Sequence, residues 1–553
     1  MGKGSFVESN TGKRPRLFPI LVILFSILLS LSIFQAVKLT LHDQHLVDDL
    51  RIVRMREEVA SQQSLSTASL PADFWARDYL TEQTPEQLQV RDLLDDQSKE
   101  EAKALCGRTL YHSLTRGFVK ADPLGEWTFV ATGDIPDMWI RDSSVQIGAY
   151  FSKIRDHPFL RGLIQGTLRT QAFLIVQDPY ANAFSPEWRE AKTHDKFGRL
   201  LGRGGWIATR NYELDSSVYF IQFLWNYVSN KDIHAPESLL QDPVFFDAIT
   251  TIVDTMITEQ HHETESPYRY SELERDGLGA KTGYTGMTWS GFRPSDDPNR
   301  FGYSIPSNVY AASALYKVLE MNKVVWKDDV LQKKVVKLLG EIEEGIEKHG
   351  IVEVEPGVRV YAYEVDGLGG VLADFDDANL PSLLSLPLLG WPKLDMELYQ
   401  TTRRRLLDPD HNPEYFNGTQ IRGIGSEHTS PGNVWPLAMI TEAITDSSID
   451  KKASIVKDLL KAQCGNGLMH ESVNANLVSS CTRPEFEWAN VMFAVLVENT
   501  LGYDCDKAAM EHLRQTVMKK EHDDTSSNPT NKGSEIPAYF AESFLEYFVQ
   551  SMT

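Results

Sequence analysis

Residues 330–349 read VLQKKVVKLLGEIEEGIEKH, and this stretch shows the pattern that decides the fold. Its apolar side chains recur at Val335, Leu338, Leu339 and Ile342, which is the i, i+3, i+4, i+7 spacing of an amphipathic helix. Eight further segments have the same spacing: 159–176, 214–229, 244–264, 308–321, 396–407, 434–445, 453–463 and 486–501. Strand-like patterns are confined to 351–354, 358–363 and 370–373, without the strand–helix alternation of a parallel sheet.

Long loops rich in glycine, proline, aromatic and acidic residues join these helical segments. Helical hairpins alternating with such loops predict an all-α fold, a barrel or toroid of helix pairs whose site is built by loops at one end. A hydrophobic content of 42% and eleven tryptophans suffice for a large core. The net charge of −22 argues against nucleic acid as a partner and favours a neutral, hydroxyl-rich ligand.

The N-terminus differs from the rest of the chain. The basic residues Lys13, Arg14 and Arg16 precede an uncharged run from Leu17 to Val37. About 20 apolar residues span a bilayer, and the basic flank stays in the cytosol. We therefore predict a type II signal anchor with the remainder of the chain in the lumen. This type of anchor also leads us to expect residence in the Golgi. A cleaved signal peptide is the alternative.

The domain organisation that we predict follows from these composition changes. The proposed divisions are a cytosolic tail over 1–16, a transmembrane helix over 17–37, a stem over 38–71, one catalytic domain over 72–503, and a C-terminal extension over 504–553 with a disordered insertion at 519–535.

The four cysteines, Cys106, Cys464, Cys481 and Cys505, include no CxxC pair, which argues against a zinc site. An oxidising lumen permits disulfides, and proximity in the chain favours Cys464 with Cys481 among the three possible pairings. One glycosylation sequon is present at Asn417.

The segment 288–297, TWSGFRPSDD, carries the strongest chemical signal. Asp296 and Asp297 are adjacent carboxylates beside Arg293, behind Trp289 and Phe292. Carboxyl groups, a cation that tunes them and flat rings on which a pyranose can lie are the parts of a sugar-cleaving site. We predict that Trp289 and Arg293 contact the sugar. The simpler interpretation of this segment is an Asx turn with a surface arginine.

The segment 133–144, GDIPDMWIRDSS, has a similar composition. Trp139 offers a ring, and Arg141 and Asp142 offer charge-assisted hydrogen bonds to sugar hydroxyls. Asp142 is also a candidate helix cap. Tyr212 and Asp215 open another predicted helix, and we predict that both contact the substrate. The alternative is that Glu213 and Asp215 only complement the helix dipole.

Two later loops add candidates. His428 lies beside Glu427 in a glycine-rich turn, and we expect it to contact a sugar hydroxyl. Glu471 follows His470 in a short non-helical stretch, and Trp488 lies downstream in a second acidic segment. We predict that His470 and Trp488 contact the substrate. Several acid-plus-aromatic loops in one acidic, luminal protein indicate carbohydrate hydrolysis by paired carboxylates.

An Asp-x-Asp motif at Asp374 and Asp376 supports a different hypothesis, a manganese-dependent luminal mannosyltransferase. Enzymes of that type need an α/β sheet for the nucleotide sugar, which the helical pattern does not favour. A calcium-dependent α-1,2-mannosidase is the other alternative.

The loops at 133–144, 212–216, 288–308, 469–472 and 486–490 together resemble glycoside hydrolase family 125, the metal-independent exo-α-1,6-mannosidases. The resemblance covers roughly residues 70–503, and the anchor and stem resemble those of membrane-anchored fungal members. It implies an (α/α)6 barrel, no metal or cofactor, and an α-mannoside substrate such as an N-glycan or mannan.

The resemblance also implies roles for individual residues. Glu471 corresponds to the general base and either Asp296 or Asp297 to the general acid of an inverting mechanism, with Asp296 preferred. Arg141, Asp142 and His428 are implied sugar contacts. The acid must hold a proton near neutral pH, and Arg293 would oppose this unless it is directed elsewhere.

Overall fold

The computed structural model describes residues 84–121, 127–157, 160–189, 205–509 and 511. Contacts along the chain separate Met1–Ser69 from Leu70–Thr553, and every described residue belongs to the second unit. The predicted anchor, stem and insertion at 519–535 lie outside the described residues. Among the residues that are described, none of the helices has the length and apolar character needed to cross a membrane.

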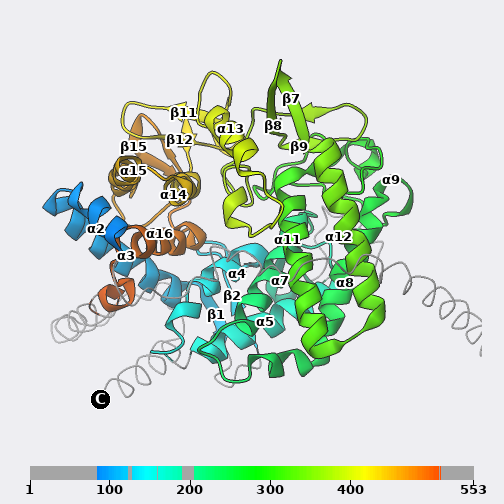
Figure 1. Cartoon of the computed structure of the whole chain (residues 1–553). Coiled ribbons are helices and arrows are strands. Elements are labelled where there is room, and N and C mark those ends of the chain that lie inside the picture. The colour runs from blue at the N-terminus through cyan, green and yellow to red at the C-terminus, as the bar shows by residue number, and fades with distance from the viewer. Residues whose placement is uncertain (1–83, 122–126, 158–159, 190–204, 510, 512–553) are drawn as a thin grey trace, which may run out of the picture. The chain divides into compact units, whose positions relative to one another are not determined.

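Five helices follow one another around the middle of the described unit (Figure 1). They are α4 (Ile140–Gly148), α7 (Leu214–Val228), α11 (Ile305–Met321), α14 (Pro436–Thr445) and α16 (Glu487–Leu501). Helix α4 packs on α7, α7 on α11, α14 on α16, and α16 returns to α4.

A buried segment around the short helix η5 (Leu386–Leu388) occupies the place between α11 and α14. Ser313 of α11 donates a hydrogen bond to the Leu389 carbonyl at 2.6 Å. On the other side, the Ala378 amide donates to the Gly425 carbonyl, ahead of α14. The contacts of the inner elements therefore run in a circle.

A second set of helices packs outside these. The set consists of α3 (Asp96–Arg116), α5 (Leu160–Gln177), α8 (Pro243–Gln260), α12 (Asp329–His349), α13 (Met396–Leu406) and α15 (Ile449–Lys461). Helix α3 packs on α16, α5 on α4 and α7, α8 on α7, α12 on α11, and α15 on α14. Figure 1 shows α8 and α12 on the outer side of α7 and α11. The prediction of a mostly helical fold is confirmed, and the alternation of inner and outer helices is consistent with an (α/α)6 barrel.

All nine predicted helical segments contain a helix, although 244–264 is divided into α8 and the short α9 (His262–Glu265). Helix α3 has 21 residues and was not predicted. Its buried side includes Cys106, Gly107, Thr109 and Ser113, small side chains that allow α16 to approach closely. An apolar periodicity does not detect a helix whose buried stripe is partly polar.

The strands are short and antiparallel, and several lead directly into an inner helix. The pairs and triplets are β1 (Phe118–Ala121) with β2 (Thr128–Val130); β3 (Met138–Trp139), β4 (Ala183–Arg189) and β5 (Gly205–Thr209); β10 (Val371–Leu372), β9 (Glu364–Val365) and β6 (Tyr303–Ser304); β7 (Ile351–Glu355) with β8 (Val358–Tyr361); β11 (Tyr415–Asn417) with β12 (Arg422–Ile424); and β13 (Asn433–Val434), β14 (Ser472–Asn474) and β15 (Leu477–Thr482). Strand β3 precedes α4, β6 precedes α11 and β13 is followed within two residues by α14, so these strands fix where the inner helices begin.

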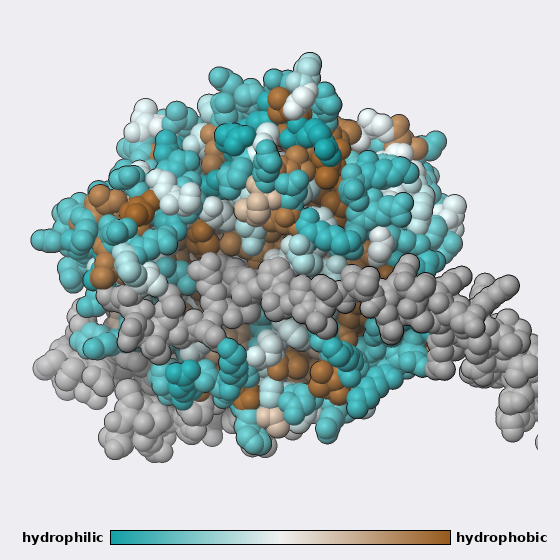
Figure 2. Space-filling view, in the orientation of Figure 1, coloured by the Kyte–Doolittle hydropathy of each residue, from teal (hydrophilic) through white to brown (hydrophobic). Residues whose placement is uncertain are grey.

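Most large apolar side chains of the described residues are buried in one continuous core. Figure 2 shows a largely hydrophilic outer face, with hydrophobic residues more frequent toward the middle of the view. Burial of this apolar surface is the main stabilising contribution to such a fold.

Both disulfides lie within the described residues. Cys464 pairs with Cys481, as proximity suggested, and Cys106 pairs with Cys505. The second bridge ties α3 to the residues just after α16, and their Cα atoms are 5.4 Å apart. It closes the ends of the helical unit over a separation of 399 residues.

Replacing both Cys106 and Cys505 with alanine is expected to lower the free energy of unfolding by about 2–5 kcal/mol, because a cross-link over a long loop restricts the unfolded chain most. Replacing Cys464 and Cys481, which are separated by 17 residues, is the matched control and should cost less. Thermal unfolding at one fixed scan rate measures both. An equal loss of unfolding free energy in the two variants would contradict the greater stabilising effect of the Cys106–Cys505 bridge.

Candidate active site

The loops that precede the inner helices meet at one end of the ring. Gly291 and Phe292 donate backbone hydrogen bonds to the Tyr212 carbonyl, and the Glu487 amide donates to the Thr132 carbonyl. Ser295 donates to Asp377 at 2.9 Å. Segments separated by tens to hundreds of residues are thus brought together at the N-terminal ends of α4, α7, α11 and α16, where helix dipoles favour negative charge.

Arg141 is the centre of a buried acidic cluster. Its guanidinium lies 2.6 Å from Glu213, 3.2 Å from Asp215 and 3.5 Å from Asp142. Burial raises the pKa of Asp142 and of Asp215 to about 6, although Arg141 opposes both shifts. The pKa of Glu213 is raised well above its usual value, first by burial and further by Asp296. One cation therefore faces more carboxyl groups than it can neutralise, and the cluster retains protons near neutral pH.

Asp296 borders this cluster. Its backbone has the left-handed φ of +69°, and its side chain has other partners than that of Asp297. Oδ1 accepts hydrogen bonds from the side-chain amides of Asn182 at 2.8 Å and Asn211 at 3.1 Å. Charge repulsion from Asp296 and hydrogen bonding to it are among the causes that raise the pKa of Glu213, so the two carboxyl groups are close neighbours.

Asp297 has a different environment. Its Oδ1 lies 3.3 Å from Nδ1 of His428, and its Oδ2 accepts from Ser295. The hydrogen bond to Asp297 raises the pKa of His428 to about 9, with smaller contributions from Asp296 and Glu471. His428 is therefore a cation at neutral pH, paired with Asp297 and electrostatically coupled to both candidate catalytic carboxyls.

Glu471 immediately precedes β14 and is 8% exposed. Its Oε1 lies 3.8 Å from Nη1 of Arg483, a distance of ionic attraction rather than a direct hydrogen bond. A carboxylate held by charge but with oxygens free of short protein hydrogen bonds can accept a proton from water. The two candidate carboxyls thus differ: Asp296 accepts from two amides and borders the Arg141 cluster, including Glu213, whereas Glu471 faces Arg483.

Arg293 is directed away from Asp296. Its side chain is fully buried and binds Glu364 at 2.6 Å and Glu427 at 2.7 Å. Burial opposes its charge, but Glu364, Tyr363 and Asp377 together outweigh that effect, and the pKa of the guanidinium is raised. Arg293 therefore braces the 288–304 loop between β9 and the 423–429 turn, which explains how an arginine close in sequence leaves Asp296 unneutralised. Its predicted contact with sugar does not fit this placement.

The aromatic candidates divide into two groups. Trp289 and Tyr212 are 1% and 2% exposed, and their rings stack on each other; Trp289 also stacks on His262, with ring centroids 3.4 Å apart. These two rings pack behind the site rather than facing a ligand, which corrects the sequence-based interpretation. Trp139, the residue before α4, remains partly exposed.

Trp488 is also 1% exposed, but the Arg141 guanidinium lies 5.3 Å from its ring. Trp488 therefore supports Arg141 by a cation–π contact from below the cluster, and its burial does not fit the predicted contact with substrate.

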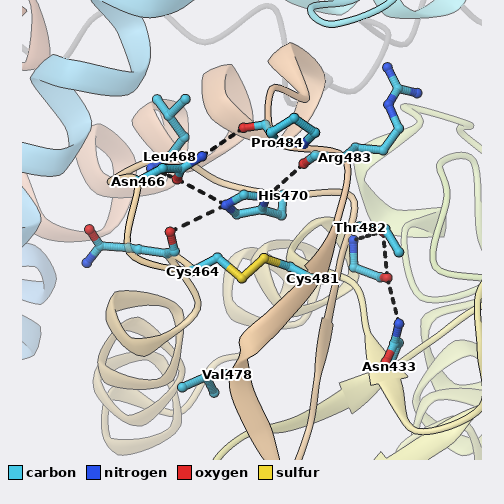
Figure 3. Close-up of a disulfide and its surroundings, with 12 residues drawn as sticks. Asn433, Cys464, Asn466, Leu468, His470, Val478, Cys481, Thr482, Arg483 and Pro484 are labelled. Atoms are coloured by element: carbon cyan, nitrogen blue, oxygen red, sulfur yellow. Dashed lines mark hydrogen bonds between the residues drawn. A yellow bond between two sulfur atoms is a disulfide. The ribbon is translucent and has the colours of Figure 1, made fainter.

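His470 likewise occupies a structural position (Figure 3). It is 3% exposed, Nδ1 hydrogen-bonds to the Arg483 carbonyl at 2.7 Å, and Nε2 contacts Asn466 at 3.0 Å. Its ligand atom lies within 4.8 Å of the sulfurs of Cys464 and Cys481, but these are joined as a disulfide. His470 fixes the backbone next to Glu471 and is not placed to touch a ligand.

The Asp-x-Asp motif does not form one acidic site. Asp374 binds Arg405 at 2.6 Å, whereas Asp376 accepts from the Leu383 and Leu384 amides at 2.8 and 2.9 Å. Asp376 is thus the cap of a buried turn, with a pKa raised by burial to about 8. The two carboxylates have separate partners, which argues against a shared metal ion there.

Several site residues were missed from the sequence. Asn182, Asn211 and Arg483 have no motif of their own, although Asn211 immediately precedes the chosen Tyr212. Glu213 was considered only for its effect on the helix dipole. Their positions become evident only when the loops meet.

Buried carboxyls with raised pKa values, two adjacent aspartates and a separate glutamate, all on loops at one end of a helical ring, are typical of a glycoside hydrolase. The comparisons agree. Residues 99–498 match the family described as metal-independent alpha-mannosidase, GH125. The chain is 34% identical over 400 residues to the Meiotically up-regulated gene 157 protein of Schizosaccharomyces pombe, which covers 69% of this chain and 78% of that protein.

A solved structure from Streptococcus pneumoniae is also similar. It is described as a metal-independent alpha mannosidase in a non-productive complex with alpha-1,6-mannobiose. It superimposes with a TM-score of 0.67 at 34% identity and covers 76% of this chain and 99% of that one. The chain belongs to glycoside hydrolase family 125, the metal-independent α-mannosidases.

Replacing Arg141 with methionine is expected to destabilise the protein by about 3–5 kcal/mol, because it leaves buried carboxylates without their cation. Arg141 lowers the pKa of Asp142 and Asp215, so its loss raises both further above 6. Carboxyls whose folded pKa is raised lose stability as the pH rises through that range. The deficit in Tm against wild type should therefore be smallest near pH 5 and grow toward pH 8. A deficit independent of pH would exclude this explanation.

Proposed function

We propose that this protein is an exo-acting α-1,6-mannosidase that removes terminal mannose with inversion, on an (α/α)6 barrel, without a metal ion or other cofactor. The natural substrate that fits is an N-glycan or a mannan. Family membership supports the mannose specificity, and the mannobiose complex of the streptococcal relative supports the linkage. The observation that carries the mechanism is the contrast between Asp296, which borders the buried acidic cluster around Arg141, and Glu471, which faces Arg483.

In this mechanism Asp296 is the general acid. It protonates the glycosidic oxygen as the bond breaks, and its buried neighbour is Glu213, whose pKa is raised well above its usual value. Asp297 is the weaker candidate because its partner is a cationic His428, which favours the ionised carboxylate. The preference for Asp296 from the sequence is therefore supported by the surroundings of the two groups.

Glu471 is the general base. It accepts a proton from the water that attacks the anomeric carbon on the opposite face, so one carboxyl gains a proton as the other loses one. His428, Asp142 and Asp215 are placed to bind sugar hydroxyls. Asp142 and Asp215 each have a buried side-chain oxygen without a protein hydrogen-bond partner among the described residues. Such oxygens are costly unless a ligand or water binds them.

Replacing Glu471 with glutamine is expected to lower kcat by roughly 10²–10⁴-fold without unfolding the protein, because the amide cannot accept the proton. Asp296→Asn should lose a comparable factor on a mannobiose but recover on an aryl mannoside whose leaving group needs no proton. Asp297→Asn should show no such recovery. Glu485→Gln, a partly exposed glutamate in the same loop region, is the matched control.

Proton NMR during turnover should show β-mannose first, and a panel of mannobioses should show preference for the α-1,6 linkage. Early α-mannose, or leaving-group recovery in Asp297→Asn instead of Asp296→Asn, would overturn the assignment.

We also propose that this hydrolase is a type II membrane protein with its catalytic unit in the lumen of the secretory pathway, in the Golgi. The two disulfides support an oxidising compartment. The basic flank and apolar run of residues 1–37 support the anchor. In sealed microsomes, added protease should remove only the N-terminal tail. Digestion of the whole chain without detergent would contradict this orientation.

A further inference from the structure

Arg483 occupies the space between the base and the first site loop. Its Nη1 lies 3.8 Å from Glu471, and its Nε donates to Asp134 at 2.8 Å, with a second short contact from Nη2 to the same carboxylate. The guanidinium also lies 5.3 Å from the Phe486 ring. Two of its nitrogens are thus committed to Asp134, and the third points toward Glu471.

The backbone holds Arg483 in this place. The residue has a left-handed φ of +52°, two positions after the disulfide-bonded Cys481, and its carbonyl oxygen hydrogen-bonds to His470. His470 is in turn the residue next to Glu471. Figure 3 shows His470 bonded to Asn466 on one side and to the Arg483 carbonyl on the other. The disulfide and His470 therefore hold the backbones of Arg483 and Glu471 in fixed positions relative to each other.

Asp134 lies 349 residues before Arg483 in the chain, and its backbone is also held in place. Its amide donates to the Glu485 carbonyl, and a Cβ at Gly133, whose φ is +121°, would lie 2.3 Å from that oxygen. The loop ahead of α4 is therefore bound closely to the loop ahead of α16. The ring of inner helices closes at this seam between the two loops. Asp134 can hold Arg483 only because this seam is closed.

The 3.8 Å separation has a chemical consequence. An arginine bonded directly to a carboxylate stabilises its anion and makes it a weaker base. An arginine farther away keeps the carboxylate ionised while leaving its oxygens to bind water. With two nitrogens committed to Asp134, Arg483 is restrained from closing on Glu471.

We propose that Arg483 is a positioning residue for Glu471, and that Asp134 sets its distance and so tunes the strength of the base. The proposal rests on the assignment of Glu471 as general base. The other charged or titratable groups around this pair are Asp142, which is electrostatically coupled to Arg483, His428, which is coupled to Glu471, the adjacent His470, and Glu485.

Substitutions at Arg483 and Asp134 should shift the pH dependence of kcat/KM in opposite directions. The acidic limb of this profile, where activity rises with pH, reports the pKa of the essential base. Arg483→Gln removes a cation, so the limb should move to higher pH by about one unit, with kcat down about tenfold. Asp134→Asn frees Arg483 to close on Glu471, so the limb should move to lower pH, by about half a unit to one unit, and the plateau should fall.

Arg483→Lys keeps the charge and should restore the wild-type limb within a few tenths of a unit. Arg116→Gln, which disturbs only a surface pair with Glu485 at 3.7 Å, is the matched control and should leave the profile unchanged.

Lower activity in Arg483→Gln and Asp134→Asn with an unmoved limb would mean a structural role only and would overturn the proposal, as would shifts of the same sign. Glu471→Gln separates this inference from the proposed function. If that variant retains activity, the assignment of the base has failed. If it is inactive and the limb does not move in the Arg483 and Asp134 variants, only the inference has failed.

Discussion

The buried guanidinium of Arg141 is the constraint on which the site depends. It lies within 3.5 Å of three carboxyl groups, from α4 and from the start of α7, and rests on the ring of Trp488 from α16. A buried carboxylate without a partner is too costly to retain its charge. One arginine shared among several acids keeps the cluster stable but undercharged, and a proton-holding pocket is the result. Three inner helices have to meet for this arrangement to exist, so the packing of the ring and the chemistry of the site are one requirement.

Three other cations near the site, Arg293, His428 and Arg483, also form ion pairs with acids. Arg293 is bound by Glu364 and Glu427 and braces the loop that carries Asp296. His428 is matched with Asp297, and Arg483 is shared by Asp134 and Glu471. Each of these cations is thus engaged by one or two acids, whereas Asp296 accepts hydrogen bonds from two neutral amides and neighbours Glu213. This distribution separates a proton donor from a proton acceptor, as hydrolysis with two carboxyls requires.

Much of the fold could be predicted from the sequence because the outer helices, such as α12 and α15, present one continuous apolar stripe to the core. Helix α3 was not predicted because its buried stripe contains small and polar side chains. The sequence predicted the acidic residues of the candidate site, but only some of the aromatic residues predicted to contact sugar are placed to do so. Trp289 and Tyr212 were chosen as sugar platforms, yet aromatic residues beside site loops fill the space behind them as readily as the space in front. Composition does not distinguish the two faces of a loop.

The sequence by itself determined the helical periods, the candidate carboxylates Asp296, Asp297 and Glu471, and the favoured pairing of Cys464 with Cys481, because each is a local property of spacing or composition. The tertiary structure decided which acid is in contact with which base or acid. Asn182, Asn211 and Glu213 reach Asp296 across 83 to 114 residues of chain, and Arg483 reaches Asp134 across 349. The protonation of a carboxyl depends on burial and on charges within a few ångströms. Those distances are set only when the loops ahead of α4, α7, α11 and α16 are brought to the same end of the ring.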